Sequence, residues 1–157
     1  MELLIKQRVF SWRDRYDVYD ESGEARYEVE AEFLTLGHQI HVTDRRSGRE
    51  VGSIHQKLFH FLPTFEIVIG GRSVGTIRKE FAFLRPRYCV DFLGWDVEGD
   101  LMGWDYRVEQ GGQSVVTVTK ELFHWGDTYV LRYGQAADEI PGLLLVIAID
   151  AANCDRN

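Results

Sequence analysis

Nine basic side chains in the middle of the chain are the residues whose type and spacing best fit a binding chemistry. They are Arg45, Arg46, Arg49, Lys57, Arg72, Arg78, Lys79, Arg85 and Arg87. Residues 44–87 hold nine basic and four acidic side chains, although the whole chain has a net charge of −7. A cluster of this kind attracts phosphate groups, and an anionic lipid surface contributes about 1 kcal/mol per nearby Lys or Arg.

All of these residues except Arg72 make up the predicted site for an anionic headgroup. The alternative is that the cations neutralise acidic neighbours across strands, which is the usual fate of surface charges. Nucleic acid is not expected as a partner, because the overall charge is acidic and no recognised binding motif is present.

Metal binding and cofactors are not expected. The five histidines are His38, His41, His55, His60 and His124. The first two are three positions apart and the next two are five apart, so on a strand each pair points to opposite faces. The two cysteines are far apart and form no zinc motif. The acidic stretch between Asp91 and Asp105 lacks the ligand pattern and central glycine of a calcium loop.

No catalytic residues are predicted. The chain has no G-x-S-x-G motif, no cysteine in a reactive setting and no paired carboxylates for acid–base work. Gly70-Gly71 and Gly111-Gly112 are interpreted as turns, because neither precedes a helix. An enzyme would have to assemble its site from distant loops.

Strand patterns fill most of the chain. Period-two alternation separated by glycine-containing turns gives about a dozen strands, including Ala25–Leu36, Met102–Glu109 and a first strand from Leu3 to Phe10. A repeat over Gly52–Ile67 recurs at Gly75–Val90, and from Ile77 onward again at Val118–Leu131; each copy is a strand, a bulky aromatic corner, a turn and a second strand. No linker divides the chain, so residues 1–157 are predicted to form a single domain.

The end of the chain predicts one helix. Asp138 and Glu139 suit its N-terminus, and residues 140–149 are apolar on every side. Ten residues are about half of a membrane span, so the surroundings are expected to be protein. The sequence therefore predicts a mainly β protein, a closed antiparallel barrel of about twelve strands around a hydrophobic C-terminal helix. Insertion of this helix into a membrane is disfavoured by its shortness and by Asp150.

The motifs resemble those of the LURP-one-related family, in the tubby-like superfamily with the tubby C-terminal domain and the phospholipid scramblases. The resemblance rests on Phe10-Ser11-Trp12 followed by Tyr16–Gly23, on the strand pair from Thr43 to Lys57, and on Leu143–Asp150. It covers essentially the whole chain and implies a twelve-stranded barrel around a C-terminal helix. It implies no settled activity; phosphoinositide-dependent tethering and lipid translocation in relatives are analogies.

The function expected from the sequence is a non-enzymatic binding or scaffold module that docks on anionic phospholipid or a phosphorylated ligand. The alternative is a small-ligand binding protein or enzyme with a pocket at the barrel mouth. The charged N-terminus does not resemble a signal peptide. A cytoplasmic protein, peripheral at a membrane and without a transmembrane segment, is therefore expected.

Overall fold

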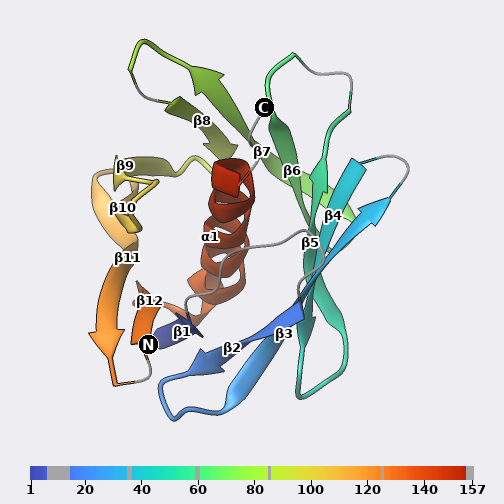
Figure 1. Ribbon diagram of the computed structural model, residues 1–157. Helices are drawn as coiled ribbons and strands as arrows, with labels where there is room; N and C mark the ends of the chain where they lie inside the picture. Colours follow the sequence, from blue (N-terminus) through green and yellow to red (C-terminus); the bar gives the residue numbers. More distant parts are fainter. Residues whose placement is uncertain (7–14, 35–36, 59–60, 85, 125, 155–157) are drawn as a thin grey trace.

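In the described part of the chain, twelve antiparallel strands surround one long helix (Figure 1). The computed structural model describes residues 1–6, 15–34, 37–58, 61–84, 86–124 and 126–154. The strands are β1 Glu2–Lys6, β2 Arg15–Asp20, β3 Ala25–Leu34, β4 Gly37–Asp44, β5 Glu50–Gln56, β6 Thr64–Ile69, β7 Arg72–Phe81, β8 Pro86–Phe92, β9 Asp96–Asp100, β10 Asp105–Gln110, β11 Gln113–Phe123 and β12 Gly126–Tyr133. A 3-10 turn, η1 (Ala136–Asp138), leads into α1 (Glu139–Cys154). The predicted fold class is confirmed.

The sheet is nearly closed. Its strand order is β8-β7-β6-β5-β4-β3-β2-β1-β12-β11-β10-β9, so the first and last strands of the chain pair with each other. The two edges of the sheet are β8 and β9, which are consecutive in sequence but are not hydrogen-bonded neighbours. The barrel therefore has one seam.

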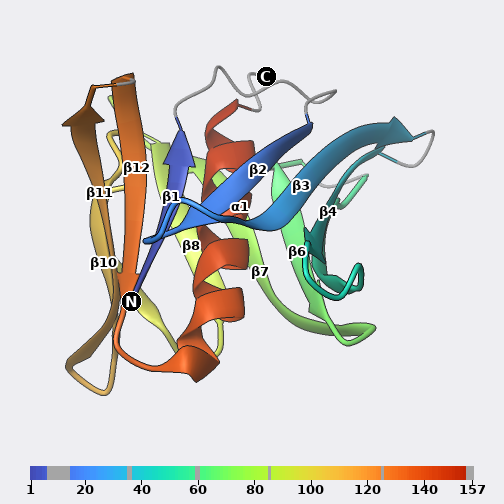
Figure 2. The same ribbon diagram turned by 90° about the horizontal axis from the view of Figure 1, so that it is seen from below.

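The helix fills the barrel. Each residue from Leu143 to Ile149 is at most 1 % exposed, as are Ala151 and Ala152. Figure 2 shows α1 lengthwise among the strands. The close packing explains Gly52 on β5, where a Cβ atom would lie only 2.5 Å from a methyl carbon of Leu144. An all-round apolar helix is thus accommodated by strands on every side.

Strand direction separates the turns into two groups. In an antiparallel meander, turns after odd-numbered strands lie at one end and turns after even-numbered strands lie at the other. Glu139 contacts Tyr27 near the start of β3, whereas Ala152 contacts Lys79 near the end of β7. We call the end with the even-strand turns the Glu139 end, and the end with the odd-strand turns the Asn153 end.

One strand boundary in the described residues differs clearly from the sequence prediction. The expected break at Gly99-Asp100 belongs to β9, and the turn comes later, at Leu101–Trp104. The Asp100 carboxylate accepts a hydrogen bond from the Gly103 amide at 2.9 Å, and Trp104 has a positive φ of 57°, so residues 102–104 cannot continue a strand. The predicted extension of β1 to Phe10 lies outside the described residues.

Candidate functional site

The Glu139 end is closed by a polar network around the start of α1. The Glu139 carboxylate accepts hydrogen bonds from the hydroxyls of Tyr27 and Tyr133, and Arg26 lies 3.6 Å away. Burial first, and the Glu139 hydrogen bond second, raise the pKa of both tyrosines. These contacts hold the helix to β3 and β12, so this network is a structural anchor.

The predicted cations at this end belong to the β4–β5 turn. Arg45 Nη2 lies 2.6 Å from an Asp17 carboxylate oxygen and 2.8 Å from one of Glu28, while Arg46 Nη2 lies 3.3 Å from Glu24. Arg49 is exposed at the same turn. Arg72 is exposed at the β6–β7 turn of the same end. Arg45 and Arg46 thus take part in cross-strand neutralisation.

The other predicted cations belong to the opposite half of the barrel. Lys57 pairs with Glu66 at 3.1 Å, Arg78 pairs with Glu80 at 2.7 Å, and Arg87 is exposed. Lys79 is buried, and its ammonium group donates to the Ala152 carbonyl at 3.2 Å. Arg85 lies outside the described residues. The structure therefore does not bring the described basic residues together on one face.

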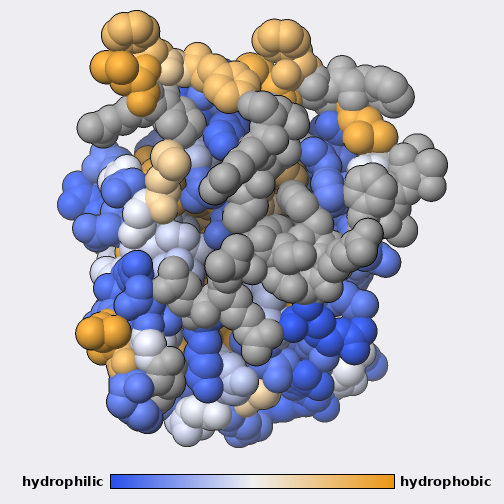
Figure 3. Space-filling view, in the orientation of Figure 1, coloured by the Kyte–Doolittle hydropathy of each residue, from blue (hydrophilic) through white to orange (hydrophobic). Residues whose placement is uncertain are grey.

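Exposed apolar side chains distinguish the Asn153 end. Eight large apolar side chains are exposed in the described part of the chain, and six of them lie in the turns of this end or at the strand ends beside them. The six are Phe61, Phe81, Phe83, Leu84, Met102 and Leu122. Phe61 and Phe83 are 98 % and 93 % exposed. Figure 3 shows apolar groups along the edge formed by the β5–β6 and β7–β8 turns.

These residues sit on turns that follow one another around the barrel. The β5–β6, β7–β8, β9–β10 and β11–β12 turns are consecutive in the strand order once the seam is crossed. We call this half-circle of turns the apolar rim. The Leu93 side chain, at the β8–β9 turn, is exposed at the Glu139 end and gives an internal comparison.

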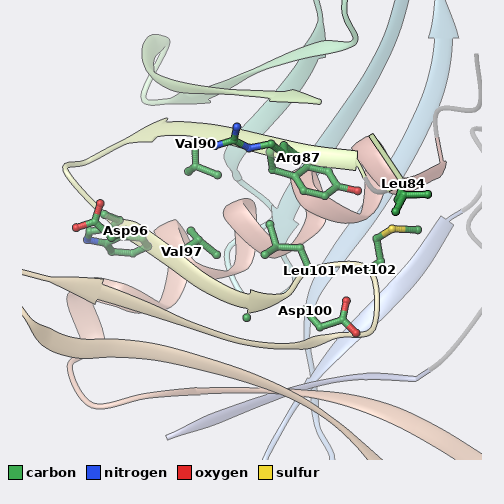
Figure 4. A pocket seen from close by; sticks show the side chains of 11 residues that line it. Leu84, Arg87, Val90, Asp96, Val97, Asp100, Leu101 and Met102 are labelled. Atoms are coloured by element: carbon green, nitrogen blue, oxygen red, sulfur yellow. The ribbon is translucent and has the colours of Figure 1, made fainter. Parts of the chain in front are cut away.

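A pocket of about 850 Å³ occupies the seam between β8 and β9, in the middle of the apolar rim. Val90 projects from β8 and Val97 projects from β9 toward it, and Leu84 and Met102 lie at its rim end (Figure 4). Arg87 also lines the pocket. The pocket is therefore lined by both apolar and polar groups, with charged side chains such as Asp96 and Asp100 beside the valines.

The end of α1 lies behind this seam. Asn153 accepts a hydrogen bond from the Tyr88 hydroxyl of β8 and donates one to the Leu101 carbonyl at 3.0 Å. One side chain thus reaches both sides of the seam. One turn earlier in α1, burial raises the pKa of Asp150 to about 7.

Tyr106 adds a second buried polar group near Asp150. Its hydroxyl has no hydrogen-bond partner in the described structure. Burial first, and the Asp150 charge second, raise the pKa of Tyr106. An acid and a hydroxyl therefore share an apolar interior at the Asn153 end, whereas the acid at the other end is fully engaged.

The described residues hold few groups suited to metal binding or nucleophilic chemistry. Among the described residues, no group of three or more His, Cys, Asp or Glu side chains could hold a metal ion. Ser53 Oγ lies 2.8 Å from His55 Nε2, but Ser53 is buried on β5, away from the seam pocket. His41 interacts with Glu32 at 2.8 Å and with Glu50. Neither contact lines the seam pocket, so neither is assigned a catalytic role.

The comparison with known families agrees with this fold. A family model described as LURP-one-related matches residues 1–150. The chain belongs to the LURP-one-related family. This family member is 33 % identical over 150 residues to "Uncharacterized protein YxjI" of Bacillus subtilis (strain 168), covering 96 % of this chain and 92 % of that protein.

A solved structure supports the same architecture. An X-ray structure of a protein from Arabidopsis thaliana matches with a TM-score of 0.63 at 15 % identity, covering 96 % of this chain and 90 % of that one. At this identity the match supports only the fold, which is tubby-like. Within the described residues, no helix is both long and apolar enough to cross a membrane.

Sequence reasoning missed the apolar rim, although its signal was present in the repeat. The three copies begin on β5, β7 and β11, which all run toward the Asn153 end. Their aromatic corners are therefore at the same end of the barrel, and they supply Phe61, Phe81, Phe83, Leu84 and Leu122. The repeat predicted hairpins correctly, but the corners were not recognised as a shared surface.

Proposed function

We propose that this protein is a binding module that docks on an anionic phospholipid surface through the apolar rim of its Asn153 end. The observation that carries the proposal is the gathering of six of the eight exposed large apolar side chains on consecutive turns of one end. Soluble proteins rarely leave extended apolar patches open unless the patch contacts something.

The energetics favour shallow insertion of these turns. Removing a Phe or Leu side chain from water contributes about 1.5–3 kcal/mol. Two or three inserted tips would therefore outweigh the contribution of the nearby cations, which is about 1 kcal/mol each. Arg87 is the exposed cation among the predicted ones nearest the rim, while Lys57 and Arg78 already pair with glutamates. Apolar contact is expected to dominate, with the cations adding a preference for anionic lipid.

Vesicle co-sedimentation tests the proposal. Neutral and anionic vesicles, at low and physiological salt, are mixed with the protein and with the double variant Phe61→Ser/Phe83→Ser. We expect the double variant to lose at least about tenfold in binding, because two tips would no longer insert. Leu93→Ser, which removes an exposed apolar side chain at the other end, is the matched control. Equal binding by all three proteins would overturn the proposal.

A charge comparison tests the role of the cations. Arg87→Glu changes the net charge as much as Arg46→Glu, but the two residues lie at opposite ends of the barrel. We expect Arg87→Glu to weaken binding to anionic vesicles by roughly tenfold and Arg46→Glu to leave it nearly unchanged at physiological salt. If Arg46→Glu has the larger effect, the docking surface is the β4–β5 turn instead.

A further inference from the structure

The seam between β8 and β9 is a place where two strand edges face each other without pairing. The two strands are joined by Leu93–Trp95, a link short enough for an ordinary hairpin. Every other pair of consecutive strands in the described sheet is hydrogen-bonded, and β8 and β9 are not. The backbone groups along both edges therefore lack sheet partners.

Several contacts keep the seam open. At the β8–β9 link, the rings of Phe92 and Trp95 pack edge to face with their centroids 5.3 Å apart. This contact holds the link between the two strands in place. At the other end of the seam, Asn153 reaches from α1 to Tyr88 on one side and to Leu101 on the other. The C-terminal end of α1 is thus bonded to both sides of the seam at the Asn153 end. The opening is built into the fold.

The unpaired edges restrict what can occupy the pocket. A lipid tail would contact Val90 and Val97 but would leave the backbone N–H and C=O groups of both edges without hydrogen bonds. An extended peptide satisfies these groups while its side chains reach the apolar walls. The chemistry of the seam therefore favours a peptide strand over an acyl chain.

The charges at the lips indicate which peptide fits. The outward-facing charged residues of the two edge strands are Arg87, Asp91, Asp96, Glu98 and Asp100, and all are exposed. Glu98 pairs with Arg107 at 2.9 Å. Acidic side chains outnumber basic ones on these outer faces by four to one. Because side chains alternate along a strand, a complementary peptide has apolar residues facing inward and basic residues facing outward.

We infer that the β8–β9 seam binds an extended segment of a partner protein in which apolar and basic residues alternate. The lengths of β9 and β8 set the segment at five to seven residues. The segment adds to the open sheet edge by main-chain hydrogen bonds, with apolar side chains against Val90 and Val97. This site goes beyond membrane docking: it runs along the wall of the barrel and meets the apolar rim at Leu84 and Met102.

Fluorescence anisotropy with a labelled peptide, Lys-Val-Lys-Val-Lys-Val-Lys, tests the inference. We expect saturable binding with a Kd below about 100 µM. In a second peptide, the central valine and the lysine on each side of it are replaced by proline. Proline has no backbone N–H to donate to the strand edge, so this peptide should bind at least about tenfold more weakly. A Glu-Val-Glu-Val-Glu-Val-Glu peptide should also bind more weakly. Equal anisotropy changes with all three peptides would overturn the inference.

Two variants locate the binding. Asp96→Lys reverses a charge at the seam and should weaken binding of the basic peptide by roughly tenfold, whereas Glu21→Lys makes the same charge change at the β2–β3 turn and should not. Slowed amide hydrogen exchange in β8 or β9 on adding peptide would support strand addition. Its absence, with binding equally reduced in both variants, would show that the peptide binds by overall charge and that the acidic lips only discourage edge pairing.

Peptide binding at the seam and vesicle binding at the apolar rim can be tested independently of each other. Peptide binding is measured without lipid, and vesicle binding is measured without peptide. Loss of peptide binding with intact vesicle docking overturns the seam site alone. Saturable binding of a fluorescent fatty acid that displaces the peptide would instead assign the pocket to an acyl chain.

Discussion

The two ends of the barrel differ in how the polar groups near each end of α1 are bonded. At the Glu139 end, the acid that begins α1 is bound by two tyrosines and approached by an arginine, and Arg45 and Arg46 are paired with acids. At the Asn153 end, burial raises the pKa of the partly buried Asp150, the Tyr106 hydroxyl has no described partner and apolar side chains at the turns are exposed. The first end is complete by itself, whereas the second leaves groups that a ligand or surface could satisfy.

The contrast shows why charge is a poor guide to the site in this protein. The cations of the β4–β5 turn are largely occupied by carboxylates, so they contribute mainly to holding strands together. The rim instead carries six of the eight large apolar side chains that are exposed in the described residues. The two ends therefore differ more in their exposed apolar side chains than in their charged side chains.

Removing α1 should have the largest effect, because both ends depend on it. Deleting residues 138–157 would leave the interior of a twelve-stranded barrel without the side chains that fill it. We expect an insoluble or unfolded product by circular dichroism and size-exclusion chromatography. Truncation after Cys154 leaves α1 intact and should preserve folding. A folded, soluble product of the long deletion would mean that α1 is a detachable anchor.

Breaking the network at the Glu139 end should have the next largest effect. Glu139→Ala leaves the hydroxyls of Tyr27 and Tyr133 without their acceptor, and we expect a loss of about 3–5 kcal/mol in the free energy of unfolding. Glu139→Gln keeps an acceptor oxygen and should lose roughly half as much. Urea denaturation measures both, with Glu21→Ala at the same end as the control. Equal stability of Glu139→Ala and wild type would refute the anchoring role.

The Asn153 end should respond in the opposite direction when its buried acid is neutralised. The pKa of Asp150 is raised from 3.8 to about 7, so the folded state binds the proton more tightly than the unfolded state. Stability from this group is therefore full below about pH 4 and is lost as the pH rises toward 7. Asp150→Asn should be more stable than wild type above pH 7, by up to about 4 kcal/mol, and should lose the advantage near pH 4.

Thermal unfolding between pH 4 and pH 8 tests this difference. The quantity of interest is the stability of Asp150→Asn minus that of wild type, since other acids titrate equally in both proteins. Asp138→Asn, a change of the same type outside the core, should show a flat difference. A flat difference for Asp150→Asn as well would mean that the ionised carboxylate is solvated in the folded protein.

Most of the fold could be predicted from the sequence, because each feature has a local signal. Glycine turns separate alternating strands, and a helix that is apolar from Ile140 to Ile149 has to be enclosed. The predicted break at Gly99-Asp100 was wrong because the turn at Leu101–Trp104 is set by a hydrogen bond from the Gly103 amide to the Asp100 carboxylate. Such a bond leaves no periodic pattern in the sequence.

Less of the site could be predicted, because a site depends on which turns share an end. Arg46 and Lys57 are close in sequence, but one strand separates their turns and they therefore lie at opposite ends of the barrel. Lys79 reads as a surface cation, yet the C-terminal end of α1 receives its ammonium group in the interior. The open seam is also invisible locally, since the Leu93–Trp95 link predicts a hairpin.

The smallest expected effect concerns the fold itself and sharpens the difference between the ends. Phe61 and Phe83 are almost fully exposed, so the Phe61→Ser/Phe83→Ser variant removes little packing. We expect its free energy of unfolding to stay within about 0.5 kcal/mol of wild type, as for most surface substitutions. Urea denaturation measures this, with Leu93→Ser as the comparison at the Glu139 end. A loss above about 2 kcal/mol would show that the tips pack within the protein and would remove the reason to assign them to a membrane.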